Sequence, residues 1–203
     1  MPAYRKIFYI VYNKGSKIGE HMKHIGTKQI ETDRLILRKF KLSDAEDMFK
    51  NYTSHKKVTK YLTWKPHKSI DDTRQYLRDV VLPAYENLNC YRWAIALKEN
   101  GQVVGAIDAI DKIKKAAHLG WVLGDKYWGM GIMPEAGKAV LEYLFEIGYE
   151  RIEAMHHIEN VKSGRVMQKI GMKHEGTLRK FHIDNNGRLI DCEMYSIIDR
   201  DFK

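Results

Sequence analysis

The sequence has few of the residues that hold small secreted or metal-dependent domains together. Among its 203 residues there are only two cysteines, Cys90 and Cys192, each within an apolar segment typical of a strand. Tetrahedral zinc sites need Cys or His at repeated short spacings. The nine histidines do not supply them, since only His156 and His157 are adjacent. We therefore expect two free thiols in a reducing, cytoplasmic compartment and no metal.

Long apolar runs are absent as well. The longest one near the N-terminus, residues 7–12, has six residues, whereas a membrane span needs about 18. We therefore expect no membrane partner and no export signal. Apolar residues make up 44% and charged residues 30% of the chain. Both values are close to those of globular proteins, which argues against a disordered tail, a collagen or a disulfide scaffold.

Acidic residues are outnumbered. The 35 Lys and Arg residues exceed the 26 Asp and Glu residues and give a net charge of +9. This excess has several interpretations: attraction of nucleic acid or a ribosome, a pocket for a polyanionic cofactor, or a solvated basic surface. Basic pairs such as Lys56-Lys57 and Arg179-Lys180 are scattered, with no long basic block. The charge alone does not choose among the three.

Hydrophobic periodicity and turn residues predict a mixed α/β fold. The expected strands are 34–40, 91–98, 103–108, 116–123, 151–157, 173–183 and 188–198, and the expected helices are 43–52, 69–88, 134–147 and 163–170. Asn100-Gly101 between apolar runs predicts a hairpin. The strand, helix and strand through 116–157 predict a right-handed crossover and a parallel pair. The fold class is therefore α/β (α+β), with a mixed, mainly antiparallel central sheet and flanking helices.

Three of the helices carry start or stop signals. Ser43-x-x-Glu46 and Ser69-x-x-Asp72 both have the spacing of a capping box, in which the two side chains satisfy free amides at a helix start. Pro83 is expected to kink or end the second helix. The third helix is expected to have Pro134 in its first turn, where a missing amide is tolerated, and to stop at Gly148.

The N-terminal residues differ from the rest because they have no sustained period. We divide the chain into a peripheral extension, residues 1–29, and a domain, residues 30–203. Met22 is a second possible start that precedes the regular pattern.

The most informative stretch is 119–137, which predicts a strand, a glycine-bearing loop and a helix start. Gly129 and Gly131 lie in the loop just before the helix. Such a loop lets backbone amides converge on phosphate oxygens while the helix dipole favours their negative charge. A plain tight turn is the alternative. The Walker pattern is excluded because no Gly-Lys-Ser/Thr follows, and the third glycine of the dinucleotide fingerprint is missing.

The motifs of this stretch resemble those of one family. Tyr-Trp-Gly-Met-Gly at 127–131 followed by Pro-Glu-Ala at 134–136 is similar to the acetyl-CoA pyrophosphate loop of GNAT N-acetyltransferases, whose pattern is Arg/Gln-x-x-Gly-x-Gly/Ala. Further motifs resemble the branch that acetylates the N-termini of ribosomal proteins: 32–38, 151–154, 160–172, Glu175-Gly176 and Asp191. The resemblance covers residues 30–200 and implies the acyl-CoA N-acyltransferase fold.

The resemblance also implies the residues that bind acetyl-CoA, which acts as co-substrate without a metal. They are Val122, Leu123, Lys126, Trp128, Gly129, Met130, Gly131, Ile132, Asn160 and Ser163. The first loop position is Lys126 rather than Arg or Gln. We expect this departure to be mild because backbone amides do most of the phosphate binding.

In such enzymes a neutral amine attacks the thioester directly, so no nucleophilic residue is required. His118 is the first candidate for the base, since its ordinary pKa suits proton transfer near neutral pH. Many relatives have an acidic residue there, so another group, a water chain or a purely structural histidine are alternatives. Ser163 is the candidate acid for the departing thiolate, and Asn160 is expected to position the cofactor. Ordinary helix caps are the alternative for both. An amide near Leu123 is expected to polarise the thioester carbonyl.

The resemblance implies transfer of an acetyl group to a primary amine, and the first expectation is the α-amino group of a ribosomal protein. The alternatives are acetylation of a small amine such as a polyamine or aminoglycoside, and a basic ribosome- or RNA-binding module without turnover. Nucleic acid is a partner only if the protein associates with the ribosome, and a homodimer is possible. Residues 52–66 and 181–188 are the expected acceptor-binding loops, because surface loops vary with function.

Overall fold

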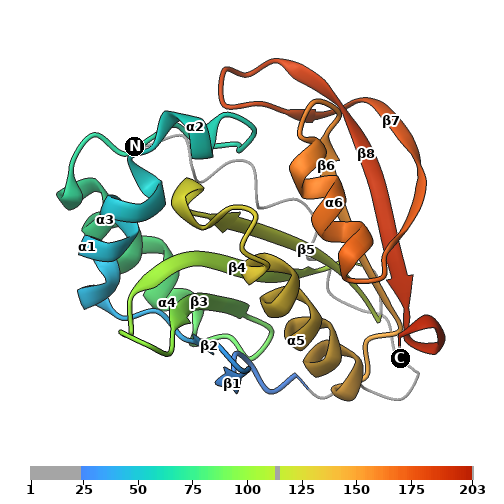
Figure 1. Ribbon diagram of the computed structural model, residues 1–203, viewed down its shortest axis with the longest axis horizontal. Coiled ribbons are helices and arrows are strands. Elements are labelled where there is room, and N and C mark those ends of the chain that lie inside the picture. Colours follow the sequence, from blue (N-terminus) through green and yellow to red (C-terminus); the bar gives the residue numbers. More distant parts are fainter. Residues whose placement is uncertain (1–23, 113–114, 203) are drawn as a thin grey trace.

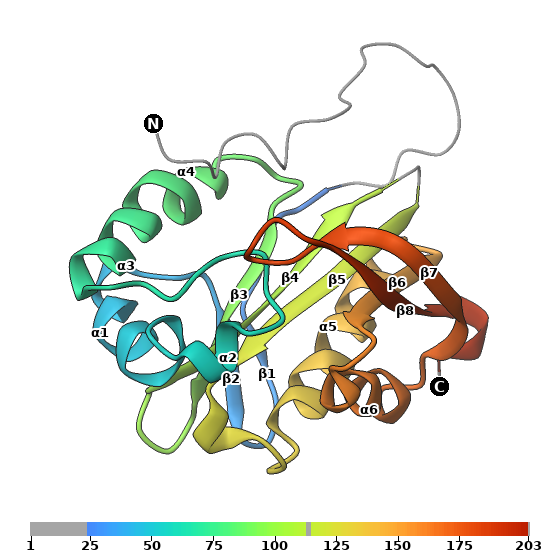
Figure 2. The same cartoon turned by 90° about the horizontal axis from the view of Figure 1, so that it is seen from above.

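A single sheet of eight strands runs through the described part of the molecule (Figures 1 and 2). The computed structural model describes residues 24–112 and 115–202. The strand order is β1-β2-β3-β4-β5-β6-β8-β7, and every neighbouring pair is antiparallel except β5 and β6. The strands are β1 (Ile30–Glu31), β2 (Leu35–Arg38), β3 (Tyr91–Leu97), β4 (Val103–Asp111), β5 (Ala116–Leu123), β6 (Arg151–His157), β7 (Lys173–Ile183) and β8 (Leu189–Ile198). The predicted mixed, mainly antiparallel sheet is confirmed.

Helices cover both faces of the sheet (Figure 2). They are α1 (Ala45–Met48), α2 (Lys56–Thr59), α3 (Ile70–Tyr76), α4 (Leu82–Ala84), α5 (Ile132–Glu146) and α6 (Val161–Lys169). α5 and α6 bury the larger apolar cluster against one face, whereas α1 and α3 bury a second cluster against the other. The two clusters give the domain two helical layers around one sheet.

The side chains of β3 show how one strand serves both layers. Tyr91, Trp93 and Ile95 are buried in the cluster under α5, whereas Ala94 and Ala96 are buried in the cluster under α1. Successive strand side chains point to opposite faces. Large residues therefore fill the space below α5, and alanines let the shorter helices lie close to the sheet.

The residues just before β1 pack against the domain. The Tyr143 hydroxyl donates to the carbonyl of Gly26 at 2.6 Å, and the Trp93 indole N–H donates to the carbonyl of Lys28 at 2.6 Å. The Thr27 hydroxyl donates to the carbonyl of Cys90 at 2.8 Å. Residues 24–29 belong to the predicted extension, and residues 1–23 lie outside the described residues. The division at residue 30 stays a prediction.

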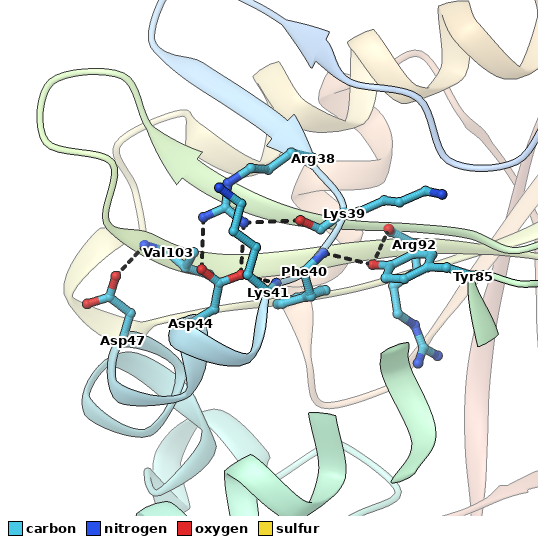
Figure 3. Close-up of polar contacts among 9 residues, drawn as sticks. All are labelled: Arg38, Lys39, Phe40, Lys41, Asp44, Asp47, Tyr85, Arg92 and Val103. Carbon is cyan, nitrogen blue, oxygen red and sulfur yellow. Dashed lines mark hydrogen bonds and ion pairs between the residues drawn. The ribbon is translucent and has the colours of Figure 1, made fainter. Parts of the chain in front are cut away.

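The start of α1 corrects one predicted cap (Figure 3). A 3-10 turn begins at Leu42, so Ser43 lies inside the first turn and is not the N-cap. The capping carboxylate belongs to Asp44, which accepts from the amide of Lys41 at 2.7 Å and from both terminal nitrogens of Arg38 at 2.8 and 2.9 Å. A buried bidentate pair is stronger than a serine cap. It fixes where the helix begins.

Other predicted helix ends are confirmed or move by a few residues. The Ser69 box is present, with Ser69 accepting from the Asp72 amide at 3.2 Å and Asp72 accepting from the Ser69 amide at 3.0 Å. α4 ends at Ala84, directly after Pro83 and before the predicted end at 88. α6 begins at Val161 rather than at the predicted 163, so Asn160 holds the N-cap position.

The parallel pair between β5 and β6 is short. Their register runs only from Ala116↔Arg151 to His118↔Glu153. Beyond this point β5 stays paired with β4, and β6 stays paired with β8. Within the described part of the chain, the facing edges of β5 and β6 are therefore without a strand partner after His118 and Glu153. This opening in the sheet lies between the glycine loop and the start of α6.

Candidate functional site

The loop between β5 and α5 presents unpaired backbone amides. Gly129 has a φ of 82° and Gly131, the N-cap of α5, a φ of 77°. Both values lie in the left-handed region, which glycine adopts without strain. Among the described residues, the amides of 129–133 have no hydrogen-bond acceptor. They stand at the positive end of a 15-residue helix, which is a suitable site for an anion.

Side chains from the turn before β2 hold this loop in place. The Arg34 Nε donates to Glu135 at 2.6 Å, and its Nη1 donates to the carbonyl of Met130 at 2.9 Å. The Thr32 hydroxyl also donates to Glu135, at 2.6 Å. Partial burial would raise the pKa of Glu135, but the hydrogen bonds from Thr32 and Arg34 outweigh it and hold this pKa below its usual range. Glu135 is therefore ionised and fastens the loop to the β1–β2 turn.

Trp128 joins the loop to elements on both sides of the opening. Its indole N–H donates to the carbonyl of Leu123 at 2.8 Å. The Nζ atoms of Lys162 on α6 and Lys57 on α2 lie 4.3 and 5.3 Å from the Trp128 ring centre. These are cation–π distances. α2, the loop and α6 therefore meet around one indole, and two ammonium groups lie beside the amide-lined loop.

The start of α6 places Asn160 and Ser163 together. The Asn160 Nδ2 donates to the Ser163 Oγ at 3.0 Å, and the Ser163 amide donates to the Asn160 carbonyl at 3.0 Å. The Asn160 side chain caps no helix amide, so the cap interpretation fails for that side chain. Because the Ser163 oxygen accepts from Asn160, its own proton points elsewhere. This geometry suits a hydroxyl that donates to another group.

His118 and Glu153 lie opposite each other on the last paired residues of β5 and β6. The His118 Nδ1 is 3.4 Å from the Glu153 Oε1. The two side chains are 15% and 21% exposed. Hydrogen bonding from His118 lowers the pKa of Glu153. Many relatives were expected to have an acidic residue at position 118 itself. Here the carboxylate beside His118 belongs to Glu153 on the neighbouring strand. The pair can take up a proton and stabilise the resulting imidazolium.

The two expected acceptor loops contact each other across the opening. The Asn185 Nδ2 donates to the carbonyl of Thr59 at 2.9 Å, which links the β7–β8 hairpin to α2. The rings of Tyr61 and His157 are 5.1 Å apart. Burial, with smaller effects from His118 and Lys112, lowers the pKa of His182. His182 lines a cavity of about 140 Å³ with Thr63, Phe181, Ile183 and Asp184.

The remaining predicted site residues lie around the same opening. Val122 and Leu123 end β5, where Leu123 pairs with Gly105 of β4. Lys126 is exposed in the short turn that follows. No contact joins Ser163 to His118 within residues 24–112 and 115–202. The structure thus brings the loop and the start of α6 together and places His118 at the closed end of the opening.

Sequence reasoning missed the Arg34–Glu135 link and Lys162. Arg34 and Glu135 both occur in the quoted family motifs, but they are 101 residues apart. The only sequence signal for their contact is that both family motifs occur in the same chain. Lys162 carries no motif, because its role comes from the position of Trp128. Contacts of this kind depend on the completed fold.

Neither a metal nor a membrane site stands out in the part of the chain that the structure describes. No cluster of three or more His, Cys, Asp or Glu side chains is arranged to hold a metal ion there. A search of the same residues finds no helix with the length and apolar character to cross a membrane. Cys90 and Cys192 are free thiols, the second one buried.

Comparisons with known proteins agree with this geometry. A family model described as an acetyltransferase (GNAT) domain matches residues 34–173. The uncharacterized N-acetyltransferase p20 of Bacillus licheniformis is 34% identical, over 84% of this chain and 96% of that protein. The crystal structure of a GNAT-family acetyltransferase from Bacillus anthracis is 31% identical, with a TM-score of 0.73 over 85% of this chain and 99% of that one.

A more distant structure is similar in fold. A ribosomal-protein-S5-alanine acetyltransferase from Vibrio fischeri is 24% identical, with a TM-score of 0.70. The match covers 87% of this chain and 99% of that chain. At this identity the likeness concerns the arrangement of strands and helices.

Proposed function

This chain belongs to the acetyltransferase (GNAT) family, and on that basis we propose that it transfers the acetyl group of acetyl-CoA to the α-amino group of a ribosomal protein. Acetyltransferase activity follows from the family. The residues that bind acetyl-CoA and the identity of the acceptor are our proposal.

The observation that carries this proposal is the row of unpaired amides at 129–132, at the start of α5. We assign these amides to the pyrophosphate of acetyl-CoA, because amides at a helix start favour phosphate oxygens. The loop fits such a group. A Cβ at Gly131 would lie 3.3 Å from the Arg34 Nη2, and the φ of 77° favours glycine, so a larger residue would strain the cradle. Lys126 and Lys162 add positive charge nearby.

The opening between β5 and β6 provides the place for the pantetheine arm. Its amide groups need donors and acceptors, and the facing edges of the two strands carry backbone groups without a strand partner. Val122 and Leu123 border the opening on one side, and Asn160 lies across from them at the start of α6. The side-chain amide of Asn160 both donates and accepts, which suits pantetheine.

The remaining residues supply proton transfers. His118, supported by Glu153, removes a proton from the acceptor ammonium so that the neutral amine attacks the thioester carbonyl. A nitrogen–carbon bond forms and the carbon–sulfur bond breaks. Ser163 donates a hydrogen bond or proton to the departing sulfur, directly or through water. An amide near Leu123 stabilises the negative charge that develops on the carbonyl oxygen.

The acceptor assignment is supported by the motifs shared with the ribosomal-protein branch and by the basic charge of the chain. A small amine, such as a polyamine or aminoglycoside, is the second candidate. It needs a pocket lined with carboxylates. Around the cavity at 181–184 the described carboxylate is Asp184, and it is already paired with Arg188 at 2.7 Å.

Thiol release from acetyl-CoA in the presence of different amines tests the proposal. A peptide with a free α-amine should give the highest kcat/KM, and the same peptide with a blocked N-terminus is the matched control. Polyamines and aminoglycosides should react more slowly. Preferred turnover of a small amine would replace the acceptor assignment. Binding of RNA without any response to acetyl-CoA would contradict the proposal altogether.

A further inference from the structure

Residues 48–70 form a lysine-rich segment, which contains six lysines and no Asp or Glu. The lysines at 50, 56, 57, 60, 65 and 68 are all exposed. Within the described residues, carboxylates lie within 4 Å only of Lys57 (Asp125, 3.5 Å) and Lys60 (Glu159, 4.0 Å). The other lysines of this segment have no acidic partner there, so their charge is directed to solvent.

Two further basic side chains lie on the β7–β8 hairpin, whose tip contacts this segment. Arg179 and Lys180 are exposed on β7 and have no ion pair among the residues described. Lys180 has a φ of 49°, and its amide donates to Asp191 at 2.8 Å. The register of β7 and β8 shifts between Leu178 and His182. This bulge bends the hairpin, whose tip reaches α2 (Figure 1).

The lysine-rich segment contacts residues on both sides of the opening between β5 and β6. Lys57 of α2 contacts Trp128 of the glycine loop, and Tyr61 contacts His157 at the end of β6. The hairpin contacts α2 through Asn185. A chain that leaves the opening on this side passes the lysine-rich segment and the hairpin that carries Arg179 and Lys180.

We propose that the acceptor is a peptide with acidic residues after its N-terminal amine, and that Lys56, Lys65, Arg179 and Lys180 bind those residues. This inference rests on the proposed function. Like charges repel and opposite charges steer the encounter, so a basic exit favours an acidic chain. It disfavours polyamines and aminoglycosides, which are cations.

The same surface is less suited to single-stranded RNA. RNA binding of this kind uses aromatic side chains on which bases stack. In the lysine-rich segment, Tyr61 is in contact with His157 and Trp64 packs against the cluster under α1. Both rings are engaged within the protein, whereas Phe181 beside Lys180 is 54% exposed and offers one stacking position. Point charges on lysines are sufficient for an acidic peptide, which needs no stacking surface.

The test uses three peptides with the same first three residues, followed by four acidic, four neutral or four basic residues. Acetylation rates are measured at low and high salt. The acidic peptide should exceed the basic one in kcat/KM by about tenfold or more at low salt, because exposed charges act over roughly 10 Å at 0.1 M salt. The difference should shrink as salt is added.

A charge-reversal variant locates the effect. Lys56→Glu with Lys65→Glu should lower the ratio of acidic to neutral kcat/KM several-fold. Lys138→Glu with Lys169→Glu is the matched control, because both lysines are exposed on α5 and α6. It makes the same charge change on the other face of the sheet. Melting curves check that both variants fold.

The outcomes separate this inference from the proposed function. Equal rates for the three peptides, or equal effects of the two variants, would overturn the inference alone. If polyuridylate inhibited acetylation of all three peptides and kcat/KM did not differ among them, the surface would be assigned to RNA instead. Failure to acetylate any peptide while a polyamine is acetylated would overturn the proposed acceptor and the inference together.

Discussion

The proposed donor side and the proposed acceptor side of the opening are built in different ways. On the donor side, the groups that face the opening are backbone amides of residues 129–132, fixed by two left-handed glycines and by Arg34. On the acceptor side, side chains of α2 and of the β7–β8 hairpin meet through contacts such as Asn185 with Thr59. A site made of backbone amides keeps its geometry in any sequence that has glycine at positions 129 and 131. A side-chain site changes with each substitution.

This difference determines how each side should respond to mutation. Changes on the donor side should weaken binding of every acetyl donor that carries a pyrophosphate. Changes on the acceptor side should alter the preference among acceptors and leave donor binding alone. Ser163 stands where the two sides meet, next to Asn160. Its replacement should act on turnover rather than on binding.

The largest effect is expected for Ser163→Ala. It should lower kcat by roughly ten- to a thousand-fold with donor affinity nearly unchanged, as is usual for loss of a general acid. Asn160→Ala should chiefly weaken binding of acetyl-CoA. A residue that only caps the helix would instead cost about 1 kcal/mol of stability and spare turnover. Initial rates and melting curves of both variants distinguish these cases. Undiminished kcat in Ser163→Ala would exclude the catalytic assignment.

Gly131→Val should weaken binding of CoA by about 100-fold, or nearly 3 kcal/mol. The valine would strain a backbone at φ 77° and place its Cβ 3.3 Å from Arg34. Gly101→Val is the matched control, because Gly101 has a φ of 74° in a hairpin with open space around it. Calorimetry with CoA measures both. Wild-type affinity in Gly131→Val would show that the pyrophosphate is bound elsewhere.

Arg34→Gln tests whether the β1–β2 turn positions the loop. It removes the donors to Met130 and Glu135, and we expect the KM for acetyl-CoA to rise by about tenfold with kcat nearly unchanged. Acetyl-pantetheine lacks the pyrophosphate, so its kcat/KM should be much less affected. Equal losses with both donors would mean that Arg34 has a general structural role.

Acid should weaken the ion pair that joins β6 to β7 across β8. Arg151, and then Ser196, lower the pKa of Glu175 to about 2, from 4.5. Because the folded pKa is depressed, this stabilisation is complete above about pH 4.5 and is lost as the pH falls towards 2. The Glu175 side chain is 39% exposed, so screening keeps the contribution under about 1 kcal/mol. Glu175→Gln should flatten this part of the stability profile. An unchanged profile would contradict the ion pair.

The smallest effect is expected for a chain that starts at Met22. It keeps residues 24–29, including the Gly26 and Lys28 carbonyls that Tyr143 and Trp93 bind. Donor affinity, turnover and melting temperature should therefore stay as in the full chain. A chain that starts at residue 30 is the contrasting variant and should melt at a lower temperature. Loss of folding on the Met22 start would place residues 1–21 in the core or in an interface.

Sequence signals with a local cause predicted the glycine loop and the helix that follows it well. Gly131, Pro134 and Gly148 each act on their own turn of the chain, and α5 begins and ends beside them. The hairpin at Gly101 and the parallel crossover are confirmed for the same reason. Short-range chemistry is sufficient in each case.

Long-range contacts explain what the sequence did not predict. Ser43 fails as a cap because Arg38 on the neighbouring strand pairs with Asp44 instead. β1 has only two residues and no period to detect. The hydrogen bond between Asn185 and Thr59 links residues that are 126 positions apart in the sequence. The loops at 52–66 and 181–188 were both expected to bind the acceptor, but their contact with each other was not predicted. Their contact became visible in the fold.

The most direct test of the account is the mass of a peptide with a free N-terminus after incubation with the protein and acetyl-CoA. The account predicts one acetyl group on the α-amine, with lysine side chains of the same peptide unmodified and no product without the donor. A polyamine or aminoglycoside added to the same reaction should remain largely unacetylated. An unmodified α-amine beside an acetylated small amine would contradict the account.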